Sequence, residues 1–224
     1  MFPEAIVFDW DSTLVDNWKS IAKALNATLI EMGKDPWTES EIRQNSKRSA
    51  REAFPEIFGE DWETALSFFY EAFEKNHLIG ITPLPGAKDL LEFLRKREIY
   101  LGIISNKNGS FLRKEIQKLG WGKYFKNVLG ATDLDFDKPS KAIVDALFQR
   151  SNITPNRLVW FVGDAVVDLE CAHLANCTPI LVETGSITKK ELIQWPPAKS
   201  FSSCVELESF LNNLENKTDG SKDK

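Results

Sequence analysis

Short apolar runs, each followed at once by polar residues, limit the possible folds of this chain more than any other feature. They lie at residues 5–8, 100–104, 158–162 and 179–182, with a weaker fifth run at 128–129. Such runs are typical of strands buried on both faces of a parallel sheet. Apolar residues at helical spacing lie between them, for example Leu90, Leu91 and Leu94. The alternation of strands and helices predicts an α/β fold with a doubly wound, Rossmann-like parallel sheet.

One segment interrupts this alternation. About seventy residues between the first run and Pro83 carry no strand pattern, far more than an ordinary crossover needs. They show helical signals instead: an apolar stripe from Trp18 to Met32, another from Trp62 to Phe73, and a capping box at Thr38-Glu41. We therefore predict an inserted all-helical domain. The predicted divisions are a core at 1–15 and 84–215, the insertion at 16–83, and a disordered polar tail at 216–224.

Charge and composition limit the classes of partner that the protein can bind. The chain has 224 residues, of which 42% are hydrophobic and 27% charged, and a formal net charge of −5. This composition is ordinary for a globular protein, and the negative charge argues against nucleic acid or an anionic membrane as a partner. We find no apolar stretch of membrane-spanning length, no signal-peptide pattern, and three cysteines without a zinc or paired spacing. We expect a cytoplasmic protein that is a monomer or a homodimer.

Polar side chains follow several predicted strands. They are Asp9, Asp11 and Thr13 after the first run, Ser105 and Asn106 after the second, Asp164 and Asp168 after the run at 158–162, and Lys138 before a helix. Each alone is also typical of a turn, a helix cap or a solvated loop. Together they should meet, because open parallel sheets bind ligands beyond the carboxyl ends of their strands. Crowded carboxylates need a cation, hard oxygen ligands suit Mg²⁺, and a lysine with a hydroxyl beside that metal suits a phosphoryl group.

These residues resemble the four ordered motifs of the haloacid dehalogenase superfamily. The motifs are Asp9-Trp10-Asp11-Ser12-Thr13-Leu14, Ser105-Asn106, Lys138-Pro139 and Gly163-Asp164 through Asp168. The helical insertion resembles the cap of that family, and the layout is most similar to phosphoglycolate phosphatases and related sugar-phosphate hydrolases. Ser12 departs from the pattern, since many members have glycine there.

The resemblance implies a Mg²⁺-dependent phosphoric monoester hydrolase that acts on a small phosphorylated metabolite. Asp9 would form an aspartyl-phosphate, and Asp11 would serve as general acid and base. The implied metal ligands are Asp9, the backbone carbonyl of Asp11, and Asp164, with Asp168 supporting the metal or orienting Lys138. The implied contacts to substrate are Ser105 and Lys138 with the phosphoryl oxygens, and Thr13 and Asn106 beside them. The acid at Asp11 disfavours the dehalogenase and phosphonate-hydrolysing branches.

The insertion carries a basic cluster that bears on specificity. It consists of Arg43, Lys47, Arg48 and Arg51, of which 43, 47 and 51 would share a face if the segment were one helix. A surface paired with nearby glutamates is the more ordinary interpretation. The sharper hypothesis is that the cluster, Arg48 above all, binds a second anionic group of the substrate. A phosphomutase, a receiver-type signalling domain and an inactive scaffold remain alternatives to the phosphatase.

Overall fold

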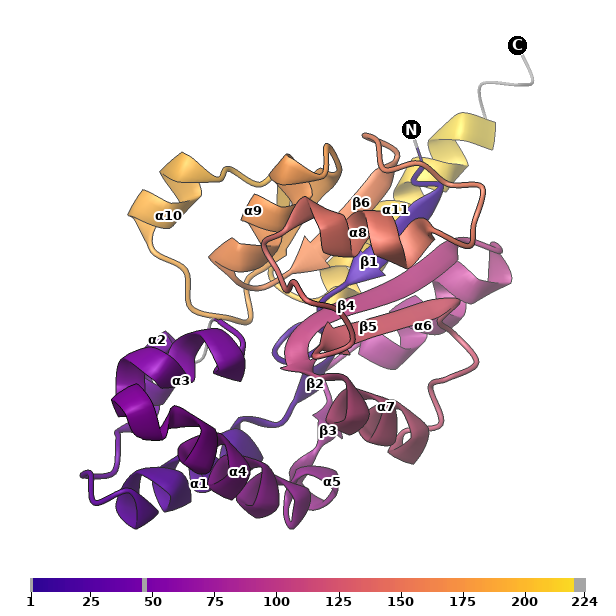
Figure 1. The fold of residues 1–224 in the computed structure, drawn as a ribbon. Helices are drawn as coiled ribbons and strands as arrows, with labels where there is room; N and C mark the ends of the chain where they lie inside the picture. The colour runs from indigo at the N-terminus through magenta and orange to yellow at the C-terminus, as the bar shows by residue number, and fades with distance from the viewer. Residues whose placement is uncertain (1, 46–47, 220–224) are drawn as a thin grey trace.

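The structure, a computed structural model, describes residues 2–45 and 48–219. Its centre is a six-stranded parallel sheet with the order β5-β4-β1-β6-β7-β8 (Figure 1). The strands are β1 (Ala5–Phe8), β4 (Tyr100–Asn108), β5 (Asn127–Ala131), β6 (Val159–Gly163), β7 (Thr178–Val182) and β8 (Lys199–Phe201). Every residue of β1 and β6 is buried, because these central strands are covered on both faces, and this burial explains their continuous apolar sequences.

Helices cover both faces of the sheet. One face carries α6 (Ala87–Lys96), α7 (Gly109–Lys118) and α11 (Cys204–Asp219), and the other carries α8 (Lys141–Phe148) and α9 (Val166–Leu174). A short helix, α10 (Lys189–Gln194), follows β7. Leu90, Leu91 and Leu94 are fully buried on α6, as their helical spacing predicts. The predicted doubly wound α/β class is confirmed.

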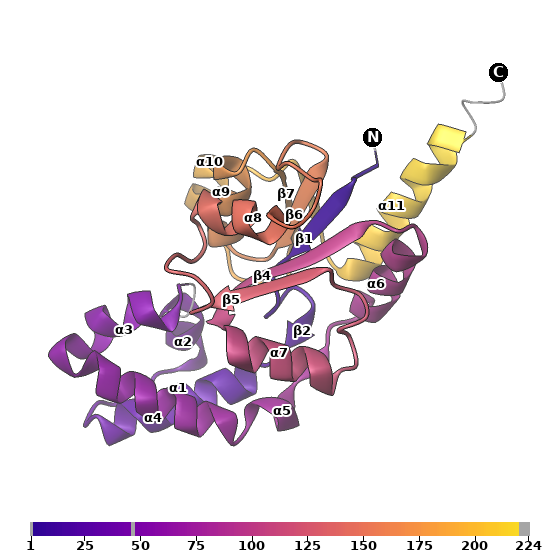
Figure 2. The same ribbon diagram turned by 45° about the vertical axis from the view of Figure 1, so that its right-hand side comes forward.

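A separate group of helices lies beyond one end of the sheet (Figures 1 and 2). It comprises α1 (Trp18–Glu31), α2 (Glu39–Asn45), α3 (Ala50–Phe58), the 3₁₀ turn η1 (Gly59–Asp61), α4 (Trp62–Glu74) and α5 (His77–Gly80). We call α1 to α5 the helical insertion. It is joined to the core by an antiparallel pair of short strands, β2 (Val15–Asp16) and β3 (Thr82–Pro83). The predicted all-helical character of this segment is confirmed.

The insertion has a small core of its own. Leu25 and Leu29 of α1 pack there with Phe54 of α3 and Ala65 of α4. The predicted capping box begins α2: the Thr38 N–H donates to Glu41 Oε2 at 2.8 Å, and the Glu41 N–H donates to Thr38 Oγ1 at 3.4 Å. Among the described residues, no helix combines the length and apolar character needed to cross a bilayer.

Two elements near the C-terminus differ from expectation. The strand β8 has the sequence Lys-Ser-Phe, and only Phe201 is buried, so it carries no apolar run to reveal it. The helix α11 continues to Asp219, although we predicted disorder from Asn216. Leu207 and Leu211 are fully buried on this helix, and a helix anchored in this way continues into a polar last turn. The rest of the predicted tail, 220–224, lies outside the described residues.

Candidate active site

The strand order brings three strand ends together. The neighbours β4, β1 and β6 are the central strands, and the chain crosses from one side of β1 to the other between β5 and β6. Such a reversal opens a crevice at the carboxyl ends of the strands on either side of it. Asp9 directly follows β1, Ser105 lies in β4 and Asp164 directly follows β6. All three line one cavity of about 170 Å³ between the sheet and the helical insertion.

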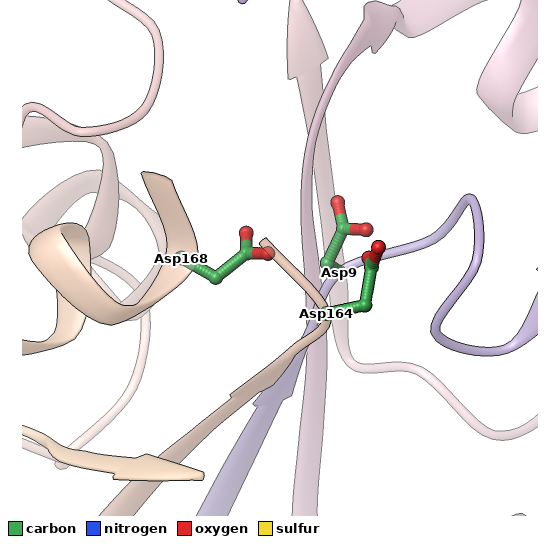
Figure 3. A group of neighbouring side chains, drawn as sticks. All are labelled: Asp9, Asp164 and Asp168. Carbon is green, nitrogen blue, oxygen red and sulfur yellow. The ribbon is translucent and has the colours of Figure 1, made fainter. Parts of the chain in front are cut away.

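Three buried carboxylates gather in this crevice. One oxygen from each of Asp9, Asp164 and Asp168 lies within 4.8 Å of the other two. Figure 3 shows the Asp168 side chain pointing from α9 toward the other two. Burial raises the pKa of Asp164 well above its ordinary value, and the charges of Asp9 and Asp168 raise it further. Positive charge nearby stabilises the three carboxylates in their ionised forms, and an all-oxygen donor set of this kind fits Mg²⁺.

Lys138 supplies one positive charge inside the cluster. Its ammonium group donates to Asp9 Oδ1 and, at 2.7 Å, to Asp168 Oδ1. Burial alone would lower the pKa of Lys138, but the charges of Asp168 and Asp9 raise it above its ordinary value, so the lysine stays protonated. Burial raises the pKa of Asp168 to about 6, against the opposing effect of Lys138. Asp168 thus accepts a hydrogen bond from the lysine, and one of its oxygens lies within 4.8 Å of an oxygen of Asp9 and of Asp164. Its two implied roles, supporting the metal and orienting Lys138, stay predictions.

The loop that carries Lys138 is held by Asn106. The Asn106 side chain accepts from the Lys138 N–H at 3.0 Å and donates to the Lys138 carbonyl at 3.2 Å. The next residues begin α8, where Ser140 accepts from the Ala142 N–H at 3.3 Å as the N-cap. Asn106 also lines the cavity, but its amide is engaged with this loop. We therefore propose that it positions Lys138 as well as lying beside the substrate.

Thr13 and Ser105 differ in their access to the cavity. Thr13 is fully buried, its hydroxyl lies 3.1 Å from Asp164 Oδ1 and 3.4 Å from Asp9 Oδ2, and it is not among the described residues that line the cavity. We propose that Thr13 orients these carboxylates, in place of the substrate contact expected from the sequence. Ser105 does line the cavity, and its hydroxyl oxygen accepts from the Lys107 N–H at 3.2 Å, which leaves its proton for an oxygen of a ligand.

Asp11 lies beside Lys107, a residue shortly after the second apolar run to which the sequence assigned no role. Lys107 Nζ donates to Asp11 Oδ1 at 2.8 Å and to the buried Glu115 Oε2 at 2.7 Å. Burial raises the pKa of Asp11 to about 6, although Lys107 opposes the shift. Lys107 follows the second motif directly, but Glu115 lies within an ordinary amphipathic helix, and neither spacing nor composition distinguishes it. The predicted metal contact of Asp11, through its backbone carbonyl, stays a prediction.

Ser12 occupies a position that favours glycine. Its φ of 62° lies in the left-handed region, where side chains other than glycine are strained. This conformation accounts for the glycine found at the position in many proteins with the same motif. In this chain the Ser12 hydroxyl accepts from the Trp18 indole N–H, so the side chain has a partner in the helical insertion.

The core lines the cavity with charged side chains, and the insertion lines it with both apolar and basic ones. The apolar residues of the insertion are Trp18, Ile21, Leu25, Phe54, Ile57, Phe69, Tyr70 and Phe73. Phe111 of α7 continues this apolar lining from the core side. A space of this size suits a small ligand.

Three arginines of the basic cluster also line the cavity. Arg43 lies in α2 and pairs with Glu39, Arg48 pairs with Glu56 at 2.6 Å, and Arg51 of α3 pairs with Asp137 of the core at 2.6 Å. The proposed single helical face is wrong, because α2 ends at Asn45 and α3 begins at Ala50. Ser49 is extended as the N-cap of α3 and interrupts the helix. Lys47 lies outside the described residues.

A comparison with known families agrees with this geometry. The family model described as haloacid dehalogenase-like hydrolase matches residues 6–182. The chain belongs to this family. The resemblance identified from the four motifs is therefore confirmed, and the chain is a hydrolase by family.

Individual relatives point to phosphatases. The phosphoglycolate phosphatase of Psychrobacter arcticus is 27% identical over 223 residues, which cover 94% of this chain and 96% of that protein. The phosphoglycolate phosphatase of Pseudomonas putida is 27% identical over 183 residues, 77% of this chain but 66% of the relative. The chain thus spans about two thirds of that second enzyme.

Solved structures share the fold. A hydrolase of the same superfamily from Ehrlichia chaffeensis superimposes with a TM-score of 0.66 at 28% identity, covering 96% of this chain and 98% of the other. A haloacid dehalogenase-like family hydrolase from Streptococcus pneumoniae reaches a TM-score of 0.82 at 19% identity, with coverage of 93% and 98%. At 19% identity the second likeness speaks for the fold alone.

Proposed function

We propose that the protein is a Mg²⁺-dependent phosphatase that hydrolyses a small phosphorylated metabolite through an aspartyl-phosphate on Asp9. The observation that carries this proposal is the buried Asp9 carboxylate at the end of β1, paired with Lys138 and close to Asp164. A nucleophilic carboxylate, a fixed cation and a cluster of oxygen donors are the parts that phosphoryl transfer needs. The relatives named phosphoglycolate phosphatase support the same reaction class.

Asp9 and Lys138 begin the reaction. A carboxylate oxygen of Asp9 attacks phosphorus and the bond from phosphorus to the leaving oxygen breaks, which leaves an aspartyl-phosphate. Lys138 and the Ser105 hydroxyl donate to the phosphoryl oxygens, so the negative charge is stabilised by donors that are already in place. Lys138 is held by Asp168 and by the Asn106 amide, so it needs no reorganisation to serve in this way.

Asp11 serves as the general acid and then as the general base. In its protonated form it gives a proton to the leaving oxygen, and as a carboxylate it then takes a proton from the water that hydrolyses the intermediate. Its pKa of about 6 places both forms within reach near neutral pH. Asp9 and Asp11 both line the cavity, so both can reach a bound substrate.

The metal would be held by Asp9, Asp164 and the backbone carbonyl of Asp11. When bound, Mg²⁺ neutralises the carboxylates and stabilises charge on the phosphoryl group. Asp168 and Thr13 would orient the ligands: Asp168 through Lys138, and Thr13 through its position between Asp9 and Asp164.

The substrate is the finer part of the proposal. We propose a phosphoglycolate or sugar-phosphate type, supported by the relatives and by the small cavity volume. Arg48 is the candidate for a second anionic group, because it lines the cavity and its side chain is 48% exposed although it pairs with Glu56. A substrate carboxylate would compete with Glu56 for its guanidinium group.

A phosphomutase is the second candidate, because it would use the same aspartyl-phosphate and shield it from water. A requirement for a sugar bisphosphate activator would identify it. Membership of the haloacid dehalogenase-like family speaks against the receiver-type signalling domain.

The test is a screen of phosphorylated metabolites with Mg²⁺, in which phosphate release is measured. Release that disappears in Asp9→Asn supports the proposed function. Transfer of phosphate between positions of one sugar without release would favour the mutase, and no reaction with any ester would refute both.

A further inference from the structure

Glu115 is a buried carboxylate to which the mechanism above gives no role. It lies in α7 with no exposed surface, and both of its oxygens are used. Oε2 accepts from Lys107 Nζ at 2.7 Å and from Trp10 Nε1 at 2.7 Å, while Oε1 accepts from Asn17 Nδ2 at 2.8 Å and lies 2.9 Å from His77 Nδ1. A carboxylate removed from water is destabilising unless such partners replace the water. Three donors and the His77 ring thus surround one buried carboxylate, and this arrangement suggests a role for Glu115 beyond packing.

Lys107 connects this carboxylate to the active site. Its ammonium group lies between Glu115 Oε2 and Asp11 Oδ1, at 2.7 and 2.8 Å, and its side chain is only 6% exposed. Lysine carries a compact charge on a flexible stem, so a single partner does not fix its position. Glu115 supplies the second partner, and the Phe73 ring, 5.3 Å from Nζ, bounds a further side. Lys107 is thus held at one place beside Asp11.

The same carboxylate contacts both connections of the helical insertion. Asn17 directly follows β2, on the chain's way into the insertion, and His77 begins α5, on the way back to β3. Both side chains are buried and both meet Glu115 Oε1. The position of Lys107, and through it that of Asp11, is therefore tied to the two segments that set where the insertion lies over the cavity.

We propose that Lys107 and Glu115 are positioning residues for Asp11: Glu115 fixes Lys107, and Lys107 holds the Asp11 carboxylate where it can protonate the leaving oxygen. Asn17 and His77 attach this pair to the insertion, which covers the leaving group. The inference rests on the proposed phosphatase function and adds two residues to its proton-transfer step.

The test uses two substrates that differ in their need for a proton. An alkyl phosphate has a poor leaving group that must be protonated, whereas dinitrophenolate leaves without protonation. The ratio kcat/KM covers the steps up to phosphoryl transfer to Asp9, so it isolates the step in which Asp11 acts as an acid. We expect Lys107→Met to lower kcat/KM for the alkyl phosphate by roughly 10- to 100-fold, and for dinitrophenyl phosphate by less than about threefold.

Lys114→Met is the matched control. Lys114 lies on α7 and also connects the core to the insertion, through an ion pair with Glu74 of α4 at 2.7 Å. Among the contacts of the described residues, none joins Lys114 to Asp11. Its loss should leave the ratio of the two kcat/KM values unchanged. Lys107→Met alone leaves the buried Glu115 carboxylate without its paired ammonium group, and this loss can destabilise the fold. The double variant Lys107→Met/Glu115→Gln removes both charges, and circular dichroism with thermal unfolding shows which variants are folded.

Each outcome is decisive. Wild-type turnover of both esters, abolished in Asp9→Asn, establishes the proposed function before the variants are compared. A loss confined to the alkyl phosphate in a folded Lys107 variant, and absent in Lys114→Met, supports the positioning role. Equal losses on both esters, or no loss on either, would overturn it while leaving the phosphatase proposal intact.

Discussion

Gly185 is a position at which a single methyl group should disable the active site. A Cβ atom placed there would lie 2.0 Å from Asp164 Oδ2 and 2.5 Å from the Asp164 carbonyl oxygen. Below 3.0 Å something must shift, so in Gly185→Ala either Asp164 or the loop that carries Gly185 is displaced. The new Cβ and Asp164 Oδ2 must separate by about 1.4 Å, the difference between 2.0 Å and the 3.4 Å at which ordinary contacts begin. A displacement of about 1 Å in a catalytic group costs roughly a hundredfold in rate. Gly185 is outside the left-handed region of backbone conformation, so the methyl group acts by contact and not by backbone strain.

We expect kcat of Gly185→Ala to fall by about 100-fold and the Mg²⁺ concentration for half-maximal activity to rise, because Asp164 is a proposed metal ligand. Phosphate release measured across a Mg²⁺ titration gives both quantities. Gly122→Ala is the control, since a Cβ at Gly122 has nothing within 4 Å. Thermal unfolding of both variants separates a local change at the site from a loss of the fold.

Wild-type kcat and Mg²⁺ dependence in Gly185→Ala would refute this reasoning. That result would mean that Asp164 is not needed where the structure has it, or that the loop after β7 moves aside at no cost. A rate loss with an unchanged Mg²⁺ dependence would instead remove Asp164 from the proposed metal ligands.

Three further predictions concern the same site. Asp9→Asn keeps the shape of the side chain but loses the anionic oxygen, so phosphate release from an aryl phosphate should fall by several orders of magnitude, and Asp11→Asn should also be severely impaired; retention of more than a few per cent of the rate by Asp9→Asn would exclude the covalent route. A chelator should abolish phosphate release, Mg²⁺ should restore it, and Ca²⁺ should do so poorly because its coordination shell is larger and looser; full activity in chelator would contradict the metal assignment. Arg48→Ala should lower kcat/KM for an anionic substrate such as phosphoglycolate by roughly tenfold and leave a neutral aryl phosphate nearly unaffected, the scale of one charge-assisted hydrogen bond. Arg43→Ala, whose guanidinium is paired with Glu39 on its own helix, is the comparison, and equal effects on both substrates would assign Arg48 to the surface.

The parts of the fold that were predicted carry local signals. The runs that became β1, β4, β6 and β7 are apolar because both of their faces are buried, and their pattern is legible without the rest of the chain. The strand β8 was not predicted, because only Phe201 is buried there and the sequence has no apolar run at that point. A shared helical face for positions 43, 47 and 51 depended on one continuous helix, and the four-residue spacing gives no sign of the break at Ser49.

The sequence by itself determined that Asp9, Asp11, Ser105 and Asp164 lie near one edge of the sheet. This follows from a short-range pattern: each of them comes at or just after the end of an apolar run, and parallel strands point their carboxyl ends to the same edge. The strand β4 continues beyond its apolar run to Asn108, with an irregular register after Ser105, and the sequence did not predict this extension. Only the tertiary structure decided what surrounds them. Glu115 of α7 contacts Lys107 of β4, and it also contacts Asn17 and His77, which lie in the two segments that connect the insertion to the core. A buried charge is stabilised by partners distant in sequence, and their convergence depends on how the helices and the sheet pack, which no local pattern records.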